Sequence, residues 1–433
     1  MPGRVAGPAA DTVGSQGGAF VRTVERWVAA LAAVVVLGGT CLGGATGEWP
    51  QWRGPDRDGL SPETGLLKQW PDGGPKLLWT AQGIGEGFST VAVAGGLIYT
   101  AGNVGGDARL TALDLTGKTQ WQVKVGPAHK VDHPGTRSTP TVDGALLYYQ
   151  NPDGTLSCLE AKSGKQVWAL NILETFGGRN ITWALAESPL VDGEQVIVCP
   201  GGPEAAMVAL DKKTGKTVWV CKGAGDKPGY ASPIVVDYQG LRQYVTMTSQ
   251  AAIGVNAKTG DLLWRFEHKT SYDANIPDAV YHDGCVFICS GYGSGGELLK
   301  LTVEGGKCSV AKAWETKALD NHHGGVVLVN GFLYGSTHRG KWVCLDFKTG
   351  DVKYTADGVG KGSITYADGM LYTYSERGAV GLVKAAPDGH AVVSQFRVPA
   401  GGRGPNWPHP VVCGGRLYLR HGDLLFAYDI KAQ

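Results

Sequence analysis

Apolar and polar positions follow one recurring pattern along most of this chain. A small residue and an apolar residue precede Asp, Asn or Glu, a Thr-Gly or Ser-Gly turn follows, and an apolar run then ends in an aromatic residue. This pattern predicts a β-hairpin, because the acidic or amide side chain can accept backbone N–H bonds in the turn and glycine adopts positive φ without strain. Five segments show it most clearly: 112–121, 158–168, 209–219, 254–264 and 344–354.

The aromatic residues that close these hairpins recur at intervals of 40–51 residues. They are Trp79, Trp121, Trp168, Trp219, Trp264, Trp314, Tyr354 and Phe396. Internal repeats with a period of roughly 20–50 residues indicate solenoids, propellers or arrays, and this spacing suits one four-stranded propeller blade. A second repeat, with an apolar run on each side of Asp-Gly or Asn-Gly, predicts the two innermost strands of each blade; 139–148 is an example.

The eighth unit is divided between the two ends of the chain. Segments 411–420 and 424–430 supply inner strands, and the chain then ends without a closing aromatic strand. Segment 75–80, P-K-L-L-W-T, is the missing strand. Pairing the first and last segments removes the exposed sheet edges. We therefore predict an all-β, eight-bladed β-propeller with tryptophan-docking repeats over residues 48–433, its ring closed by an N-terminal strand.

Residues 1–47 read as an export signal. Arg22 and Arg26 precede an uncharged run from residue 27 to 47, and A-T-G at 45–47 suits a small-residue cleavage site. An uncleaved membrane anchor is the alternative, because about 20 apolar residues can span a bilayer. Cys41 follows G-G-T, a poor lipidation signal. We expect an exported protein, periplasmic or at the cell surface.

Composition narrows the classes of partner. Residues 48–433 contain equal numbers of basic and acidic residues once the three arginines and two acids before them are set aside, so nucleic-acid binding, which needs a basic surface, is not expected. No C-x-x-C motif or adjacent cysteine pair occurs, so zinc knuckles and c-type haem are unsupported. We expect a monomer.

The A-x-D-x-x-T-G-K-x-x-W phrase resembles the tryptophan-docking repeat of pyrroloquinoline-quinone (PQQ) propellers. Segments 49–61, 187–193, 320–331 and 407–420 resemble the secreted PQQ-like repeat proteins of planctomycete-type and verrucomicrobial bacteria. No Trp-Asp dipeptide supports the WD40 alternative. The resemblance implies a fold shared with the lipoprotein propeller of outer-membrane assembly, which binds protein without PQQ.

The same resemblance raises the question of a cofactor. Quinoprotein dehydrogenases hold PQQ on the propeller axis with Ca²⁺ bound by Glu, Asn and Asp oxygens, use an Asp as general base, and often stack the quinone on a vicinal disulfide. This chain lacks the vicinal cysteines and any haem motif. We therefore predict no cofactor, with PQQ and calcium as the alternative.

Residues just before each innermost strand should line one mouth of the central funnel, where a rigid scaffold holds loops that carry sites. Alignment of the repeats places Ser89, Arg137, Glu187, Tyr230, Asn275, His323, Lys361 and His409 in this ring, with Trp183, Trp407 and His322 beside them. We expect a ligand to bind there.

His322 and His323 are expected on one strand, pointing to opposite faces, so no metal site is predicted from them. His323 is the candidate acid/base residue, with His409 or Asp320 as its partner. The residues leave two functions open: a binding or scaffold module for protein or glycan at the funnel mouth, or a PQQ/Ca-dependent alcohol or sugar dehydrogenase. Whether the protein is an enzyme stays undecided at this point.

Overall fold

The computed structural model describes residues 47–432, so the predicted export segment lies outside the described residues except for Gly47. Strands dominate this range. It contains one short helix, α1 (Ile172–Phe176), and one 3-10 turn, η1 (Ser271–Asp273). Within the described range, no helix combines the length and apolar character that membrane crossing requires.

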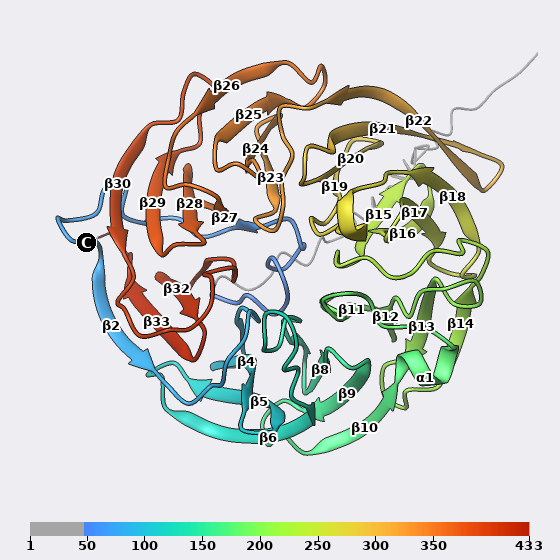
Figure 1. The fold of residues 1–433 in the computed structure, drawn as a ribbon, viewed down its shortest axis with the longest axis horizontal. Coiled ribbons are helices and arrows are strands. Elements are labelled where there is room, and N and C mark those ends of the chain that lie inside the picture. The colour runs from blue at the N-terminus through green and yellow to red at the C-terminus, as the bar shows by residue number, and fades with distance from the viewer. Residues whose placement is uncertain (1–46, 433) are drawn as a thin grey trace, which may run out of the picture. The chain divides into compact units, whose positions relative to one another are not determined.

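The strands form eight sheets arranged around a central axis, which confirms the predicted eight-bladed propeller (Figure 1). The first four blades are β3 (Ala92–Ala94), β4 (Leu97–Val104), β5 (Asp107–Asp114), β6 (Thr119–Pro127); β7 (Thr141–Asp143), β8 (Leu146–Gln150), β9 (Thr155–Glu160), β10 (Gln166–Asn171); β11 (Leu190–Asp192), β12 (Gln195–Val198), β13 (Met207–Asp211), β14 (Thr217–Cys221); and β15 (Ile234–Tyr238), β16 (Leu241–Met247), β17 (Ala251–Asn256), β18 (Leu262–Glu267).

The last four blades are β19 (Val280–His282), β20 (Cys285–Ser290), β21 (Gly295–Glu304), β22 (Lys307–Thr316); β23 (Val326–Val329), β24 (Phe332–Ser336), β25 (Trp342–Asp346), β26 (Val352–Ala356); β27 (Gly362–Ala367), β28 (Met370–Ser375), β29 (Ala379–Lys384), β30 (Val392–Arg397); and β31 (Val411–Cys413), β32 (Arg416–His421), β33 (Leu424–Asp429), β2 (Lys76–Ala81). The short strand β1 (Leu60–Ser61) pairs in parallel with β27. Each blade is otherwise an antiparallel meander.

The ring is closed as the sequence predicts. Strand β2 pairs with β33 and places Trp79 on the outer strand of the eighth blade. Arg420 of β32 reinforces this joint: it is 1% exposed, and its guanidinium donates to the backbone carbonyls of Gly85, Ser89 and Ala101 in the first blade. Closure therefore combines a strand pair with a buried arginine.

Tryptophans on the outer strands join neighbouring blades. The indole N–H of Trp219 donates to the carbonyl of Ala257 at 3.2 Å, and its ring packs against Gly260 in the same turn. Gly260 has φ of +78°, and a Cβ there would lie 2.6 Å from the indole, so glycine is required. Four other tryptophans make the same contact with the next turn: Trp79, Trp121, Trp168 and Trp314.

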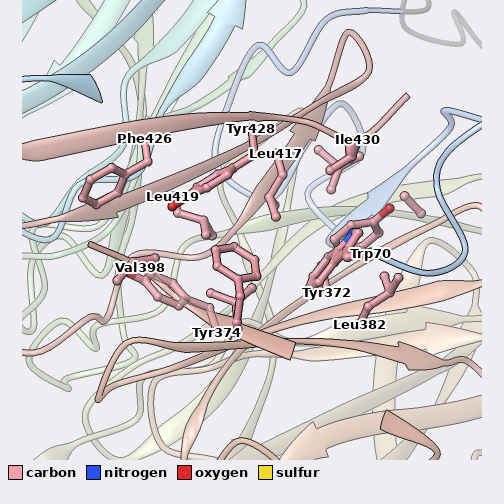
Figure 2. Close-up of a cluster of buried hydrophobic side chains, with 14 of the residues drawn as sticks. Trp70, Tyr372, Tyr374, Leu382, Val398, Leu417, Leu419, Phe426, Tyr428 and Ile430 are labelled. Carbon is pink, nitrogen blue, oxygen red and sulfur yellow. The ribbon is translucent and has the colours of Figure 1, made fainter. Parts of the chain in front are cut away.

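The core is divided into layers between adjacent blades. Figure 2 shows the layer between the seventh and eighth blades, where Tyr372, Tyr374 and Tyr428 pack with aliphatic side chains of both sheets. Trp70, which precedes β2, packs in the same layer, its ring centroid 5.3 Å from that of Phe396. The N-terminal segment thus completes the core as well as the sheet.

Residues 49–61 form a plug inside the ring of blades before the chain reaches the outer rim as β2; the segment is blue in Figure 1. The plug hydrogen-bonds to the inner strands or their entrances in seven blades. Its partners are Val93, Val142, Ser188, Asp278, Val326, Tyr366 and Val412. Because this one short segment makes hydrogen bonds to blades all around the ring, the plug ties the blades together.

Candidate functional site

A cavity of about 390 Å³ opens among the loops that lead into the innermost strands. All eight blades contribute to it, because every such loop lies at the same end of the axis. Its lining residues are Phe88, His133, Arg137, Trp183, Ala186, Tyr230, Ile276, Tyr292, His322, His323, His338, Lys361 and Trp407. A smaller space of about 90 Å³ shares part of this lining and is bordered by the plug residues Trp52 and Arg53.

Aromatic rings form much of the cavity wall. The Trp407 ring centroid lies 4.9 Å from that of Phe88 and 5.6 Å from that of His323. On the third blade, Trp183 lies 6.0 Å from Tyr230, whose hydroxyl accepts the Trp183 backbone N–H at 3.2 Å. These contacts hold the rings in place, so the wall is rigid and apolar before any ligand enters.

Arg137 brings a positive charge to this wall, and no carboxylate among residues 47–432 forms an ion pair with it. Its guanidinium donates to the backbone carbonyls of Gly135 at 2.8 Å, His133 at 3.0 Å and Asp132 at 3.2 Å, and lies 5.9 Å from the Phe88 ring centroid. Burial lowers the pKa of Arg137 to about 10, which leaves it charged at neutral pH. The cation is therefore fixed by the loop 132–135 but is not neutralised by it.

Lys361 is the other cation in the lining. Its Nζ lies 3.5 Å from a carboxylate oxygen of Glu376, which also lies 3.4 Å from the indole nitrogen of Trp407. Burial lowers the pKa of Lys361, and the charge of Glu376 partly opposes that shift. Glu376 balances Lys361, so Arg137 carries the unbalanced charge of the cavity.

Three histidines from the sixth blade meet at the cavity. The Nδ1 atoms of His322 and His323 lie 3.3 Å apart, and Nε2 of His322 lies 3.1 Å from the Tyr292 hydroxyl. His338 packs against His322 with ring centroids 4.8 Å apart. Burial, reinforced by the positive charge of Lys361, lowers the pKa of His322 to about 3 and that of His323 well below its usual value. Both rings are neutral at pH 7.

His409 belongs to the smaller space above the plug. Its Nε2 lies 2.9 Å from the backbone carbonyl of His323 and donates to it, so the remaining ring nitrogen, Nδ1, is an acceptor. Burial lowers the pKa of His409 to about 3. The ring also packs on Trp52 at a centroid distance of 4.5 Å. This histidine links the plug to the mouth.

The structure brings most of the predicted ring together. Eight of the eleven predicted residues border the two spaces: Arg137, Trp183, Tyr230, His322, His323, Lys361, Trp407 and His409. Glu187 and Asn275 do not line either space. Glu187 is 2% exposed and accepts the backbone N–H of Cys199 at 2.7 Å, and the Asn275 amide donates to the carbonyls of Thr248 and His268.

Glu187 and Asn275 lie behind the cavity lining for the same reason. Successive side chains in an extended segment point to opposite sides, and the neighbours Ala186 and Ile276 occupy the lining positions instead. The same offset places Phe88 in the cavity and buries Ser89 behind it. Alignment on the Asp-Gly or Asn-Gly turns located each loop correctly but assigned the side-chain direction wrongly in three blades.

The expectation that His322 and His323 point to opposite faces is also wrong. Neither residue is in a strand, since β23 begins at Val326, and the irregular segment turns both rings toward the cavity. Asp320 does not orient His323 either: its carboxylate accepts the backbone N–H groups of Gly293 and His338. His323 therefore has a position in the site but no carboxylate holding it for acid/base work.

Sequence reasoning missed several cavity residues. Tyr292 and His338 come from the turns between the second and third strands of the fifth and sixth blades, which end at the same mouth. Trp52 and Arg53 come from the plug, whose path through the channel no repeat predicts. Only the W-P-Q-W-R-G segment itself, which lies outside the repeat pattern, marked the plug as unusual.

The donor set does not fit the calcium ion that accompanies PQQ. No acidic side chain is in the lining of the larger cavity. In the smaller space, Asp278 accepts from the Trp52 indole at 2.5 Å and from the Ser232 backbone N–H at 2.7 Å. Over residues 47–432, no group of three or more His, Cys, Asp or Glu side chains is arranged to hold a metal ion. A cation would also lie near the uncompensated Arg137.

Comparison with known proteins places the chain in a family. The sequence family described as outer membrane protein assembly factor BamB matches residues 72–198 and 106–356. The chain belongs to this family. BamB of Shewanella oneidensis is 24% identical over 277 residues, which are 57% of this chain and 64% of that protein.

Quinoproteins are similar as well. The quinoprotein alcohol dehydrogenase PedH of Pseudomonas putida is 26% identical over 220 residues, 48% of this chain and 34% of that protein. The matched region therefore spans less than two thirds of the length of either relative. A europium-containing methanol dehydrogenase superposes with a TM-score of 0.65 at 14% identity, over 87% of this chain and 90% of that one. This likeness supports the propeller fold alone.

Proposed function

We propose that this chain is an exported binding module that takes a group of a protein or glycan partner into its funnel-mouth cavity, without PQQ. The observation that carries this proposal is the preformed cavity itself, built by loops of all eight blades and walled by packed aromatic rings. Such concave, largely apolar sites with a few convergent polar groups are the usual form of a binding site. The plug residues Trp52 and Arg53 border the smaller space that shares part of this lining.

The dehydrogenase alternative fits the cavity poorly. A calcium site needs several oxygen ligands, whereas the three candidate residues either lie behind the cavity lining or already accept hydrogen bonds. Asn275 Oδ1 accepts the Ser290 hydroxyl at 2.6 Å, Asp278 is bonded as described, and Glu187 lies behind the lining with a pKa raised to about 7 by burial. No step of a dehydrogenase reaction follows from these residues.

Binding at the cavity is tested by calorimetric titration of the purified full chain. The probes are a neutral trisaccharide, chitotriose; a short peptide ending in phenylalanine with a free carboxylate; and PQQ with Ca²⁺. We expect saturable binding of the trisaccharide or the peptide, lost in Trp407→Ala and retained in the rim variant Trp168→Ala. A stoichiometric PQQ–calcium complex that oxidises alcohols with a dye acceptor, or binding unaffected by Trp407→Ala, would contradict the proposal.

A further inference from the structure

The charge balance of the cavity distinguishes it from an ordinary aromatic pocket. Of its two cations, Lys361 lies beside Glu376, whereas no carboxylate in the described part of the chain forms an ion pair with Arg137. The histidines His322 and His323 add no further positive charge to the wall, because burial keeps them neutral. The cavity therefore presents one unbalanced positive charge in a partly desolvated, apolar setting, where its attraction for an anion is stronger than in water.

The guanidinium also has hydrogen-bonding capacity left. It has five N–H groups, and its three contacts with the loop 132–135 involve both N–H groups of Nη2 and one of Nη1. The Nε–H and one Nη1–H remain. These two N–H groups lie on opposite sides of the guanidinium, and each can donate one charge-assisted hydrogen bond to an anion. The loop holds the guanidinium in place, so little side-chain entropy is lost when an anion binds.

The rest of the lining indicates what the carboxylate is attached to. Five aromatic side chains contribute to the wall: Phe88, Trp183, Tyr230, Tyr292 and Trp407. The lining contains no Asp, Glu, Asn or Gln, the side chains that would pair with the many hydroxyls of a sugar. Flat rings bind flat apolar groups by stacking and edge contacts. This composition favours an aromatic body over a glycan.

We infer that the ligand group is a carboxylate on an aromatic body, with Arg137 binding the carboxylate and the Trp407 and Trp183 walls binding the ring. This inference rests on the proposed function, since it names the group that the same cavity binds. Such a group occurs in free aromatic acids and in the C-terminal residue of a protein chain that ends in Phe, Tyr or Trp. Both present the same chemistry to the cavity.

Three probes of one shape test the charge requirement on the wild-type full chain: 2-naphthoate, the neutral 2-naphthamide and the cationic 2-naphthylmethylamine. Calorimetry is expected to show saturable binding of 2-naphthoate. The amide should bind about 10- to 100-fold more weakly, the factor that a hydrogen bond to a charged group is worth, and the amine more weakly still. Equal binding of acid and amide would overturn the inference, and this comparison requires no variant to fold.

Variants then assign the effect to Arg137. Arg137→Gln should abolish the preference for acid over amide, and Arg137→Lys should restore part of it, because the charge returns without the planar guanidinium that the loop holds in place. Arg109→Gln is the matched control, since Arg109 pairs with Asp107 in the first blade and does not line the cavity. If Arg137→Gln keeps the full preference, the inference is wrong.

Two further comparisons distinguish a protein chain end from a free acid as the ligand, and a failure of this inference from a failure of the proposed function. A peptide ending in phenylalanine is compared with its C-terminal amide; tight binding of the free-acid peptide alone identifies a protein chain end, and tighter binding of 2-naphthoate identifies a free acid. If chitotriose binds in a Trp407-dependent way while no carboxylate does, the carboxylate inference fails and the binding function stands. If no probe binds, both fail.

Discussion

The outer rim and the funnel mouth are made by the same eight repeats, yet they differ in how often the same residues and contacts recur from blade to blade. At the rim, one contact recurs five times: an indole on one blade packs on a glycine turn of the next and donates to a carbonyl there. At the mouth, equivalent positions of the eight blades have eight different residues, among them Arg137, Ala186, Tyr230 and Lys361.

This difference separates positions that maintain the fold from positions available for function. A contact repeated between blades has to satisfy the same geometry each time, so its residues vary little within the chain. The mouth has no such requirement, because its residues need only complete one cavity. Two joints without this tryptophan contact are built differently. Trp264 donates to Gln243 in its own blade, and Phe396 packs under Gly74 of the N-terminal segment.

The largest loss of stability is expected when the closing joint is removed, because the N-terminal segment supplies the outer strand of the eighth blade there. Deleting residues 48–80 removes the plug, Trp70 and strand β2, so the eighth blade keeps an exposed edge. We expect aggregation or failure to fold, measured as soluble yield and by thermal melting. The control is a deletion that stops at residue 46. A truncated protein that melts like wild type would show that the ring does not need this strand.

A rim tryptophan should affect stability without affecting ligand binding. Trp219 is 8% exposed and makes the complete joint contact. Truncating a buried tryptophan typically costs about 3–5 kcal/mol, so Trp219→Ala should lower the free energy of unfolding by about that much in a urea titration. Probe affinity, measured well below the melting transition, should stay within about two-fold. Lost affinity with unchanged melting would mean that the rim takes part in binding.

Glu187 lies behind the mouth, where it meets the framework of the blades. Its ionisation should make the free energy of unfolding depend on pH. Burial raises its pKa from 4.5 to about 7 in the folded protein. Between those values the unfolded chain loses the proton and the folded chain keeps it, so stability falls as pH rises from 4.5 to 7. Glu187→Gln removes this dependence and should be more stable than wild type above pH 7, by at most about 3 kcal/mol.

The measurement is urea unfolding at pH 4, 6 and 8, read as the difference between variant and wild type. That difference should grow with pH up to about 7 and then stay constant. Glu160→Gln, which alters a half-exposed carboxylate in a rim turn, controls for the loss of one acidic group. A flat difference across the range would show that Glu187 is ionised in the folded state.

Most of the fold could be predicted from the sequence because it is repeated. Each hairpin phrase reports the same local geometry, and the orphan strand around Trp79 shows how the ring closes. The site was predictable only in part. Repeat alignment located each loop that leads into an innermost strand, but the direction of a side chain in an irregular segment depends on contacts such as that of Glu187 with Cys199, which no local pattern encodes. The plug made single, unrepeated contacts and left no periodic signal.

The smallest effect on stability, and the clearest on binding, is expected for Trp407→Ala. Trp407 is only partly buried, and its neighbours Phe88, His133 and His323 belong to loops rather than sheets. Its truncation should therefore change the free energy of unfolding by no more than about 1 kcal/mol, since surface substitutions away from the core cost little. Binding of 2-naphthoate should fall at least about ten-fold, because one aromatic wall of the cavity is gone. Trp168→Ala, measured beside it, should show the reverse: clear destabilisation and unchanged affinity. If Trp407→Ala destabilised the protein as much as Trp168→Ala, the mouth would be part of the structural framework, and the distinction between rim and mouth would fail.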